Sequence, residues 1–366
     1  MLDERGVARY LIERGLIAPE RVVAGDLEIR DVSRRNRNHR VESRDGPSYL
    51  VKQATTADGR ATLAQEASAY RVLGSTGGVA AGYVPSFHGY DEERSLLVLE
   101  LVKSGRTLAE HHTRGRFPVT LARAVGRALG ALHAESTGAA RRRGEPPYAV
   151  QIHRPTVDWL RDVSAANAEL VRLIQGAPPL VEALEELRSD WRVECLVHND
   201  YKADNCVVVR GRDGRARTIR LVDWEIAGPG DPAWDAGSVL GDYLGTWLSS
   251  IPITGADPPE RFAELARFPL ARMRPALAEF WAAYTTQAGL DATDADRRLV
   301  RSVRYSAARL VQTASEQTQY STRVNGTTLC LVQVAANVLR RPHEAAVRLL
   351  GIPLRGAARP AAEAPA

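Results

Sequence analysis

The sequence predicts an α+β fold in two parts, a small N-terminal antiparallel sheet that carries one helix and a larger, mainly helical C-terminal part. Three observations predict it. Five short runs before residue 103 are typical of strands, and the first two of them alternate apolar and polar residues. Apolar residues recur at helical spacing over most of the chain after residue 103, and a pair of short β-runs interrupts the helices near residue 210. With 44% hydrophobic and 25% charged residues, the 366-residue chain has the composition of a globular protein with a sizeable core.

The N-terminal part is predicted to hold a short helical region, then five strands around one further helix. Apolar residues at helical spacing predict helices over 5–17 and 61–73, with a short turn that begins at Pro19 and glycines that end the second helix near Gly77. The runs that predict strands are 27–32, 40–43, 48–54, 83–90 and 95–102. We therefore place a first domain over residues 1–102.

The rest of the chain is predicted to be helical apart from one hairpin. The expected helices include one around Leu121 to Leu132, two over 156–174 and 180–190, and a helical region over 236–350 with a long helix near 294–319. The hairpin pairs 206–209 with 218–222 around a turn at Asp213-Gly214. The second domain is placed over 103–354, and the Pro/Ala-rich residues 355–366 are expected to be a disordered tail.

Composition and charge exclude several classes of protein. The net charge is +5, but the basic residues are spread along the chain without interleaved aromatic residues, which predicts no nucleic-acid partner. No apolar run approaches ~18 residues, so no membrane span is expected. The first residues show no secretory signal, and the three cysteines lack the spacing of a metal site, so we expect a cytoplasmic protein.

Lysine is rare in this chain. Only Lys52, Lys103 and Lys202 are lysines among the 49 basic residues. Each one is a candidate for a place where a compact point charge cannot be exchanged for a planar guanidinium, although chance would also leave a few, and Lys103 is an example for which we expect no function.

Polar side chains gather at one end of the predicted hairpin. Asn205 lies eight residues before the turn and Asp223 nine residues after it, so both are expected at the open end, where Asp200 also enters. Two carboxylates and a carboxamide are ligands that suit Mg²⁺. A set of turn and cap residues would give the same spacing, because Asp and Asn are common at strand ends.

The residues around these side chains form a motif. Residues 198–205 read His-Asn-Asp-Tyr-Lys-Ala-Asp-Asn, the form H-x-D-x-x-x-x-N, and Asp223-Trp224-Glu225 follows the next strand. Together with Gly230-Asp231-Pro232-Ala233-Trp234-Asp235, these pieces resemble the protein-kinase-like superfamily, most closely its aminoglycoside phosphotransferase family. The resemblance extends from about Asp26 to Tyr284. It implies a bilobal protein-kinase-like fold and an ATP- and Mg²⁺-dependent phosphotransferase that acts on a hydroxyl group.

The resemblance implies roles for individual residues of the catalytic loop. Asp200 would orient the acceptor hydroxyl or accept its proton, and Lys202 would contact the phosphate that is transferred. Asn205 and Asp223 would hold Mg²⁺, and His198 would brace the loop. Asp235 would tie the loop down from the next helix.

The resemblance also implies a nucleotide site in the first domain. Lys52 matches the family's lysine to the α- and β-phosphates, and Glu66 is its natural partner, because it borders the buried face of the predicted helix; an ordinary surface glutamate is the alternative. Adenine would bind backbone groups of the segment from Glu100 to Val102. The loop over 33–40 contains no glycine, so Ser33 and arginines are expected to replace a glycine-rich phosphate cradle.

Three hypotheses describe the acceptor. The arginine-rich loop and Lys202 resemble phosphotransferase-type kinases of lanthipeptide and thioamitide biosynthesis, which implies Ser or Thr of a precursor peptide as the substrate and a lyase as a partner. The alternative is a small-molecule kinase that acts on an aminoglycoside-like compound or another metabolite, although the mixed charge of the helices after Ala236 disfavours a polycation. A catalytically inactive partner subunit is disfavoured because Lys52, Asp200, Asn205 and Asp223 are all present. The four residues between Glu225 and Gly230 leave no room for an activation segment.

Overall fold

The computed structural model describes residues 2–33, 36–75, 77–103, 105–139, 144–210, 217–253, 258 and 261–356. The chain divides into two compact units. The first contains Met1–Leu108 and Asp204–Gly228, and the second contains Ala109–Ala203 and Pro229–Ala366. The predicted hairpin thus groups with the N-terminal residues.

The first unit is built on a five-stranded antiparallel sheet with the order β1-β2-β3-β5-β4. Its elements are α1 (Glu4–Glu13), α2 (Pro19–Val23), β1 (Leu27–Asp31), β2 (Arg37–Ser43), β3 (Tyr49–Gln53), α3 (Ala57–Ser75), the 3₁₀ turn η1 (Ala80–Tyr83), β4 (Phe87–Asp91) and β5 (Leu96–Glu100). All five predicted strands are confirmed. The strand expected from residue 83 starts only at Phe87, because Pro85 has no N–H for a sheet hydrogen bond.

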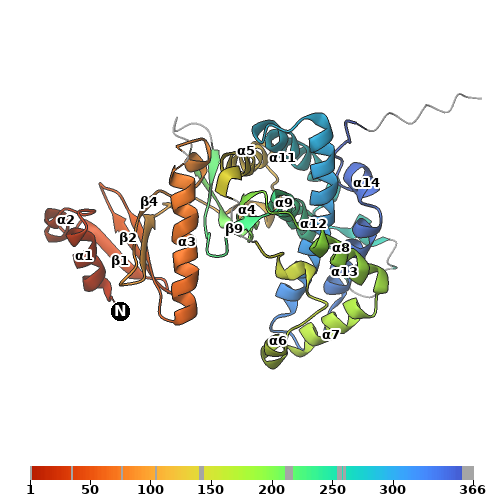
Figure 1. Cartoon of the computed structure of the whole chain (residues 1–366), viewed down its shortest axis with the longest axis horizontal. Coiled ribbons are helices and arrows are strands. Elements are labelled where there is room, and N and C mark those ends of the chain that lie inside the picture. The colour runs from red at the N-terminus through yellow and green to blue at the C-terminus, as the bar shows by residue number, and fades with distance from the viewer. Residues whose placement is uncertain are drawn as a thin grey trace, which may run out of the picture. The chain divides into compact units, whose positions relative to one another are not determined.

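Each face of this sheet is covered by one helix, as Figure 1 shows for α1 and α3. Val41, Tyr49 and Val51 are buried against Val7 and Leu11 of α1 and form one core cluster. The alternate residues of β3 point to the opposite face, where α3 lies. Period two therefore places Lys52 on the α3 face.

Two more strands of the first unit form the predicted hairpin, β7 (Cys206–Arg210) and β8 (Arg217–Leu221). Cys206 pairs with Leu221 and Val208 with Ile219, so the strands are antiparallel and in register. The expected turn at Asp213-Gly214 lies outside the described residues.

The second unit is mainly helical. Its elements are α5 (Val119–Glu135), η2 (Thr137–Ala139), η3 (Tyr148–Val150), α6 (Val157–Asp162), α7 (Ala165–Gln175), α8 (Pro178–Ser189), β6 (Cys195–Val197), α9 (Pro232–Ser249), α10 (Phe262–Leu265), η6 (Leu270–Arg272), α11 (Arg274–Gln287), α12 (Ala292–Thr318), α13 (Gly326–Arg340), α14 (Pro342–Glu344) and a π-helical turn η7 (Ala345–Leu349). Three short elements span the points where the chain passes from one unit to the other: α4 (Leu108–His112), the 3₁₀ turn η4 (Ala203–Asn205) that leads into the hairpin, and β9 (Gly228–Gly230). The helix expected over 156–174 is two helices, because Ser164 interrupts it and caps α7 through the Asn167 N–H.

Helix α9 lies at the centre of this unit and is buried on nearly all sides, with α12 packed along it. Helices α5 and α11 approach each other closely where α5 carries Gly126 and Gly130. A Cβ atom at Gly130 would lie 2.7 Å from the backbone oxygen of Tyr284, so only glycine permits this approach. The helix pair thereby brings Tyr284 to a fixed position beside α5.

The end of the described chain is tied to α12. The backbone N–H groups of Arg355 and Gly356 donate to the carboxylate of Asp296, at 2.9 Å and 2.6 Å. The rest of the tail predicted from the sequence lies outside the described residues. Across the described ranges, no helix combines the length and the apolar character that crossing a membrane requires.

Candidate active site

Lys52 and Glu66 form an ion pair in the first unit. The Lys52 Nζ lies 2.8 Å and 3.0 Å from the two carboxylate oxygens of Glu66. Glu66 is 1% exposed, so it is not the surface glutamate that the sequence left open. Burial disfavours the ammonium, but Glu66 and Asp223 outweigh this effect and raise the pKa of Lys52 above its usual value. Lys52, whose side chain is 12% exposed, is therefore a fixed cation on the α3 face of the sheet.

Asp223 joins this pair from the hairpin. One of its carboxylate oxygens lies 3.5 Å from Lys52 Nζ, and its side chain is 39% exposed. The backbone of Asp223 has φ +67°, in the left-handed region, which costs a non-glycine residue about 1 kcal/mol or more. The adjacent Trp224 is fully buried, and its indole N–H donates to the Leu221 carbonyl. The buried indole fixes this strained turn and so sets the position of the carboxylate.

Asn205 lies at the same open end of the hairpin as Asp223. The Val222 N–H donates to the Asn205 carbonyl at 2.9 Å, directly before the β7–β8 ladder. The sequence-based expectation that these two side chains flank the hairpin mouth is thus met, and Asn205 is 6% exposed. No group of three or more His, Cys, Asp or Glu side chains suited to a metal ion occurs in the described part of the chain. The carboxylate and the carboxamide fit Mg²⁺, which needs few protein ligands when phosphates and water supply the rest.

The loop over residues 198–203, which carries Asp200 and which we call the catalytic loop after its predicted role, is anchored to α9 in the second unit. The carboxylate of Asp235 accepts the His198 N–H at 2.7 Å and the Asn199 N–H at 3.0 Å. The Trp234 indole N–H donates to the Asn199 carbonyl at 3.0 Å. Asn199 has φ +66°, so these contacts hold a strained residue directly before Asp200. His198 is fully buried in this loop.

Asp200 and Lys202 contact each other. The Lys202 Nζ lies 2.8 Å from an Asp200 carboxylate oxygen, and both side chains remain partly exposed. Burial lowers the pKa of Lys202, but the Asp200 carboxylate outweighs this and raises it. Lys202 is therefore a cation at neutral pH, and it cannot serve as a base.

Helix α12 adds a second cation that the sequence analysis missed. Arg309 is 5% exposed and holds both carboxylate oxygens of Glu316, at 2.8 Å and 3.3 Å. Burial opposes its charge, but Glu316, then Asp200 and Asp242, outweigh burial and raise the pKa of Arg309. The Asp242 carboxylate in turn accepts the Ala203 N–H at 3.2 Å. In the sequence, Arg309 is visible only as an arginine among apolar residues of a predicted helix.

The segment predicted to bind adenine ends strand β5. The Glu100 side chain accepts the N–H and the hydroxyl of Ser86, both at 3.0 Å, so it belongs to the sheet. The backbone groups of Val102 have no hydrogen-bond partner among the residues that the structure describes. Lys103, for which we expected no function, donates to the Ser43 carbonyl at 2.6 Å.

The arginine-rich loop is shorter than the sequence suggested. Residues 37–40 belong to β2, and Arg34 and Arg35 lie outside the described residues. Arg37 pairs with Asp31 at 3.6 Å, and Arg40 pairs with Glu42 at 3.0 Å. The Ser33 hydroxyl accepts the Asn38 N–H at 3.1 Å and closes the turn between β1 and β2. The described arginines of this loop are thus already paired within the sheet.

Comparison with solved structures finds similar folds. The structure titled "Amicoumacin kinase hAmiN in complex with AMP-PNP, Ca2+ and Ami" is 14% identical, with a TM-score of 0.52 over 91% of this chain and 96% of that chain. Macrolide 2'-phosphotransferase MphH from Brachybacterium faecium is 18% identical, with a TM-score of 0.45 over 93% of this chain and 98% of that chain. At these identities the first similarity shows the fold alone. No curated protein matches the sequence.

Comparison with family profiles matches more than half of the chain. The profile described as "Phosphotransferase enzyme family" covers residues 28–280. This range runs from β1 to α11 and includes the Lys52–Glu66 pair, the catalytic loop and Asp235. The chain therefore belongs to the phosphotransferase enzyme family, the APH family of ATP-dependent kinases with a protein-kinase-like fold.

Proposed function

We propose that this enzyme transfers the γ-phosphoryl group of ATP, with Mg²⁺, to a hydroxyl group of a small molecule that carries no strong positive charge. The cluster of Lys52, Glu66 and Asp223 in the first unit carries the proposal, because a partly buried lysine held by a buried glutamate beside an exposed carboxylate has no role in packing. A cation of this kind binds phosphate oxygens.

The nucleotide is bound by groups of the first unit. Lys52 contacts the phosphates, and Glu66 keeps the ammonium in place. Asn205 and Asp223 hold Mg²⁺, which when bound neutralises charge on the β- and γ-phosphates. Val102 offers its backbone N–H and C=O to the adenine edge. Ser33 reaches the phosphates from the turn between β1 and β2.

The acceptor hydroxyl is oriented by the catalytic loop. Asp200 accepts its hydrogen bond and then its proton as the oxygen attacks the γ-phosphorus, and the bond from that phosphorus to the bridging oxygen of the β-phosphate breaks, so that ADP leaves. Lys202 donates to the Asp200 carboxylate and, with its ammonium fixed there, stabilises negative charge on the phosphoryl group in transfer. His198 braces the loop through its backbone N–H to Asp235.

The charges near Asp200 favour an acceptor that is not a polycation. Among the described residues, Glu316 is neutralised by Arg309, Asp242 accepts the Ala203 N–H, and Asp200 is paired with Lys202. A substrate rich in ammonium groups would have to displace one of these partners. A neutral, hydroxyl-bearing molecule would not.

A small molecule is preferred over the precursor peptide suggested by the sequence. The peptide interpretation rested on the arginine loop, and its described members Arg37 and Arg40 are paired with carboxylates of the sheet. The solved structure with the TM-score of 0.52 is titled a kinase in complex with amicoumacin, a small molecule. Neither the peptide nor a lyase partner gains support from these contacts.

The test is a panel of acceptors incubated with the enzyme and MgATP, with each product located by mass. The panel contains neutral sugars, amino sugars, macrolides and aminoglycosides beside Ser- and Thr-containing peptides, and the Asp200→Asn variant serves as the blank. Phosphorylation of neutral small molecules supports the proposal. Phosphorylation of peptides alone would overturn it in favour of the peptide kinase.

A further inference from the structure

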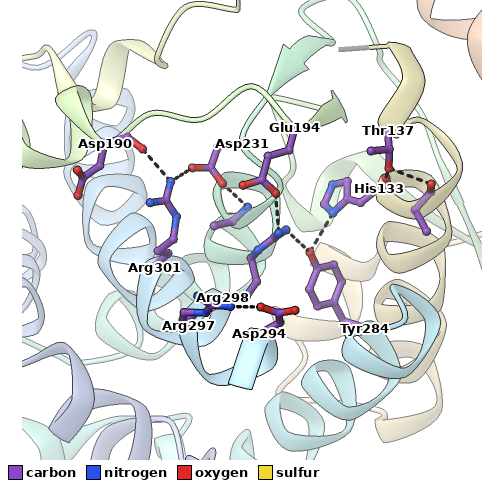
Figure 2. A network of polar contacts seen from close by, with 12 residues as sticks. His133, Thr137, Asp190, Glu194, Asp231, Tyr284, Asp294, Arg297, Arg298 and Arg301 are labelled. Carbon is purple, nitrogen blue, oxygen red and sulfur yellow. Dashed lines mark hydrogen bonds and ion pairs between the residues drawn. The ribbon is translucent and has the colours of Figure 1, made fainter. Parts of the chain in front are cut away.

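A chain of polar side chains leads from Glu194, which is partly exposed, through the second unit to Asp235, which anchors the catalytic loop. Figure 2 shows four of its members, Glu194, Arg298, Tyr284 and His133. Glu194 lies 2.7 Å from Arg298, and Arg298 donates to the hydroxyl of Tyr284 at 3.3 Å. The Tyr284 hydroxyl lies 3.1 Å from Nδ1 of His133, and Nε2 of His133 lies 3.3 Å from the Asp235 carboxylate. The members come from the residue before β6 and from α12, α11, α5 and α9.

The chemistry of each group fixes the direction of every hydrogen bond in this chain. A guanidinium only donates, so the Tyr284 oxygen accepts from Arg298 and its hydroxyl hydrogen is left to donate to His133 Nδ1. Burial raises the pKa of Tyr284, so the phenol keeps that hydrogen. His133 Nε2–H then donates to Asp235. Neutral His133 with its proton on Nε2 is the form in which the Tyr284 hydroxyl hydrogen and the His133 ring N–H each have an acceptor.

The chain leads to the strained part of the catalytic loop. The Asp235 oxygen that contacts His133 is the same Oδ2 that accepts the His198 N–H, and the other oxygen accepts the N–H of Asn199. Asp235 is fully buried, and a buried carboxylate stays in place only while hydrogen bonds satisfy its charge. Asn199, with its left-handed backbone, directly precedes Asp200.

The packing of the helices supports this arrangement independently. Tyr284 is completely buried, and it reaches His133 only because Gly126 and Gly130 let α11 approach α5. Its ring also packs against Phe280 and Trp281, with centroids 6.1 Å and 5.4 Å away. A phenylalanine would fill this space equally well, so packing does not explain the hydroxyl.

We propose that Tyr284 and Arg298, acting through neutral His133, are positioning residues that hold Asp235 and thereby fix the catalytic loop with Asp200 in its reactive conformation. The inference rests on the proposed role of Asp200, and it adds three residues remote from substrate to the determinants of phosphoryl transfer. A loop held by a satisfied network transfers the phosphoryl group without first reorganising.

The test compares two buried tyrosines in the complete enzyme. Tyr284→Phe removes the hydroxyl that links Arg298 to His133. Tyr305→Phe removes a buried hydroxyl that contacts Leu187 and Asp231 instead, at 3.4 Å and 3.3 Å, and is the matched control. Amide hydrogen exchange is measured in the peptide over residues 196–203, and hydrolysis of MgATP, with water as the acceptor, is followed by release of ADP.

Tyr284→Phe is expected to speed exchange at His198 and Asn199 and to lower kcat about tenfold with KM for ATP unchanged, because the loop loses its fixed position but the nucleotide site is intact. Tyr305→Phe is expected to change neither. Equal exchange in the two variants would show that the chain only stabilises the fold and would overturn the proposal. Should Tyr284→Phe fail to fold, the partly exposed Arg298→Met interrupts the same chain one step earlier.

A pair of variants at His133 tests whether a side chain that donates to Asp235 keeps the loop protected from exchange. His133→Gln can still donate an N–H to Asp235, whereas His133→Leu cannot, so Gln is expected to keep slower exchange than Leu. Identical exchange in both would contradict the proposed donation to Asp235. Exchange is measured without an acceptor, so it tests the chain even if the acceptor proves to be a peptide. An active Asp200→Asn would instead count against the proposed function.

Discussion

The ammonium of Lys52 and the carboxylate of Glu66 meet through both carboxylate oxygens, at 2.8 Å and 3.0 Å, on the α3 face of the sheet. Glu66 is 1% exposed and has no other cation beside it in the described residues. The pair therefore holds a compact charge at a fixed place. The predictions below concern Lys52, Asp200, the Arg309–Glu316 pair and the contact between α5 and α11.

Lys52→Arg keeps the charge and changes its shape. A planar guanidinium is wider than an ammonium and cannot occupy the same position beside Glu66, so ATP affinity or turnover is expected to fall by about tenfold or more, about 1.4 kcal/mol. Nucleotide binding is measured by calorimetry and turnover by ADP release. Lys103→Arg is the matched control, because an arginine can also donate to the Ser43 carbonyl. Equal losses in the two variants would contradict a special role for Lys52.

Asp200→Asn removes the carboxylate that we propose accepts the acceptor's proton, and it keeps the size of the side chain. We expect phosphoryl transfer to be lost while the melting temperature and ATP affinity stay close to those of the wild type, because only an interaction with the reacting hydroxyl is removed. Product formation by mass and ATP binding by calorimetry measure the two effects separately. Turnover near the wild-type rate would mean that the catalytic loop is assigned wrongly.

The Arg309–Glu316 pair is expected to set the preferred charge of the acceptor. Arg309→Met frees the half-exposed Glu316 carboxylate and should shift kcat/KM toward amino sugars over neutral sugars by about fivefold, roughly 1 kcal/mol. Glu316→Gln leaves Arg309 without its anionic partner and should shift the same ratio in the opposite direction.

The control for this pair is Arg297→Met, which removes an exposed arginine of the same helix that pairs with Asp294. It is expected to leave the ratio unchanged. A shift in the same direction for Arg309→Met and Glu316→Gln would show that the pair acts on stability and not on acceptor charge, and melting curves of each variant check this directly.

Gly130→Ala tests the close approach of α5 and α11. The added methyl group would meet the Tyr284 backbone oxygen at 2.7 Å, so the helices must separate, at an expected cost of about 1–3 kcal/mol of unfolding free energy in urea. Gly74→Ala in α3 is the matched control, since nothing lies within 4 Å of its added Cβ, and it is expected to stabilise the helix by about 0.5–1 kcal/mol. An unchanged free energy of unfolding in Gly130→Ala would show that the contact between the helices is loose.

Local patterns in the sequence were sufficient to predict the sheet and the hairpin. Strand faces follow from alternation over a few residues, so period two separates Lys52 from Val51 and Tyr49, which face α1, and leaves it on the α3 face of the sheet. The hairpin register follows from the distance to its turn, which is why Asn205 and Asp223 were expected at one end. The boundary at Ser164 was missed because a cap depends on a single residue.

The sequence by itself determined the fold class, the hairpin and the motif around Asp200, because each is encoded within a few residues by periodicity and spacing. Only the tertiary structure decided which buried polar residues meet. His133, Tyr284 and Arg298 lie on three helices, and Arg309 occupies a helix position where the sequence shows only an arginine among apolar residues. Contacts between helices depend on how the whole unit packs, and the periodicity of a short stretch of sequence does not encode them. The role of a hydroxyl or guanidinium on a buried helix face can therefore be identified only when its hydrogen-bond partner is known.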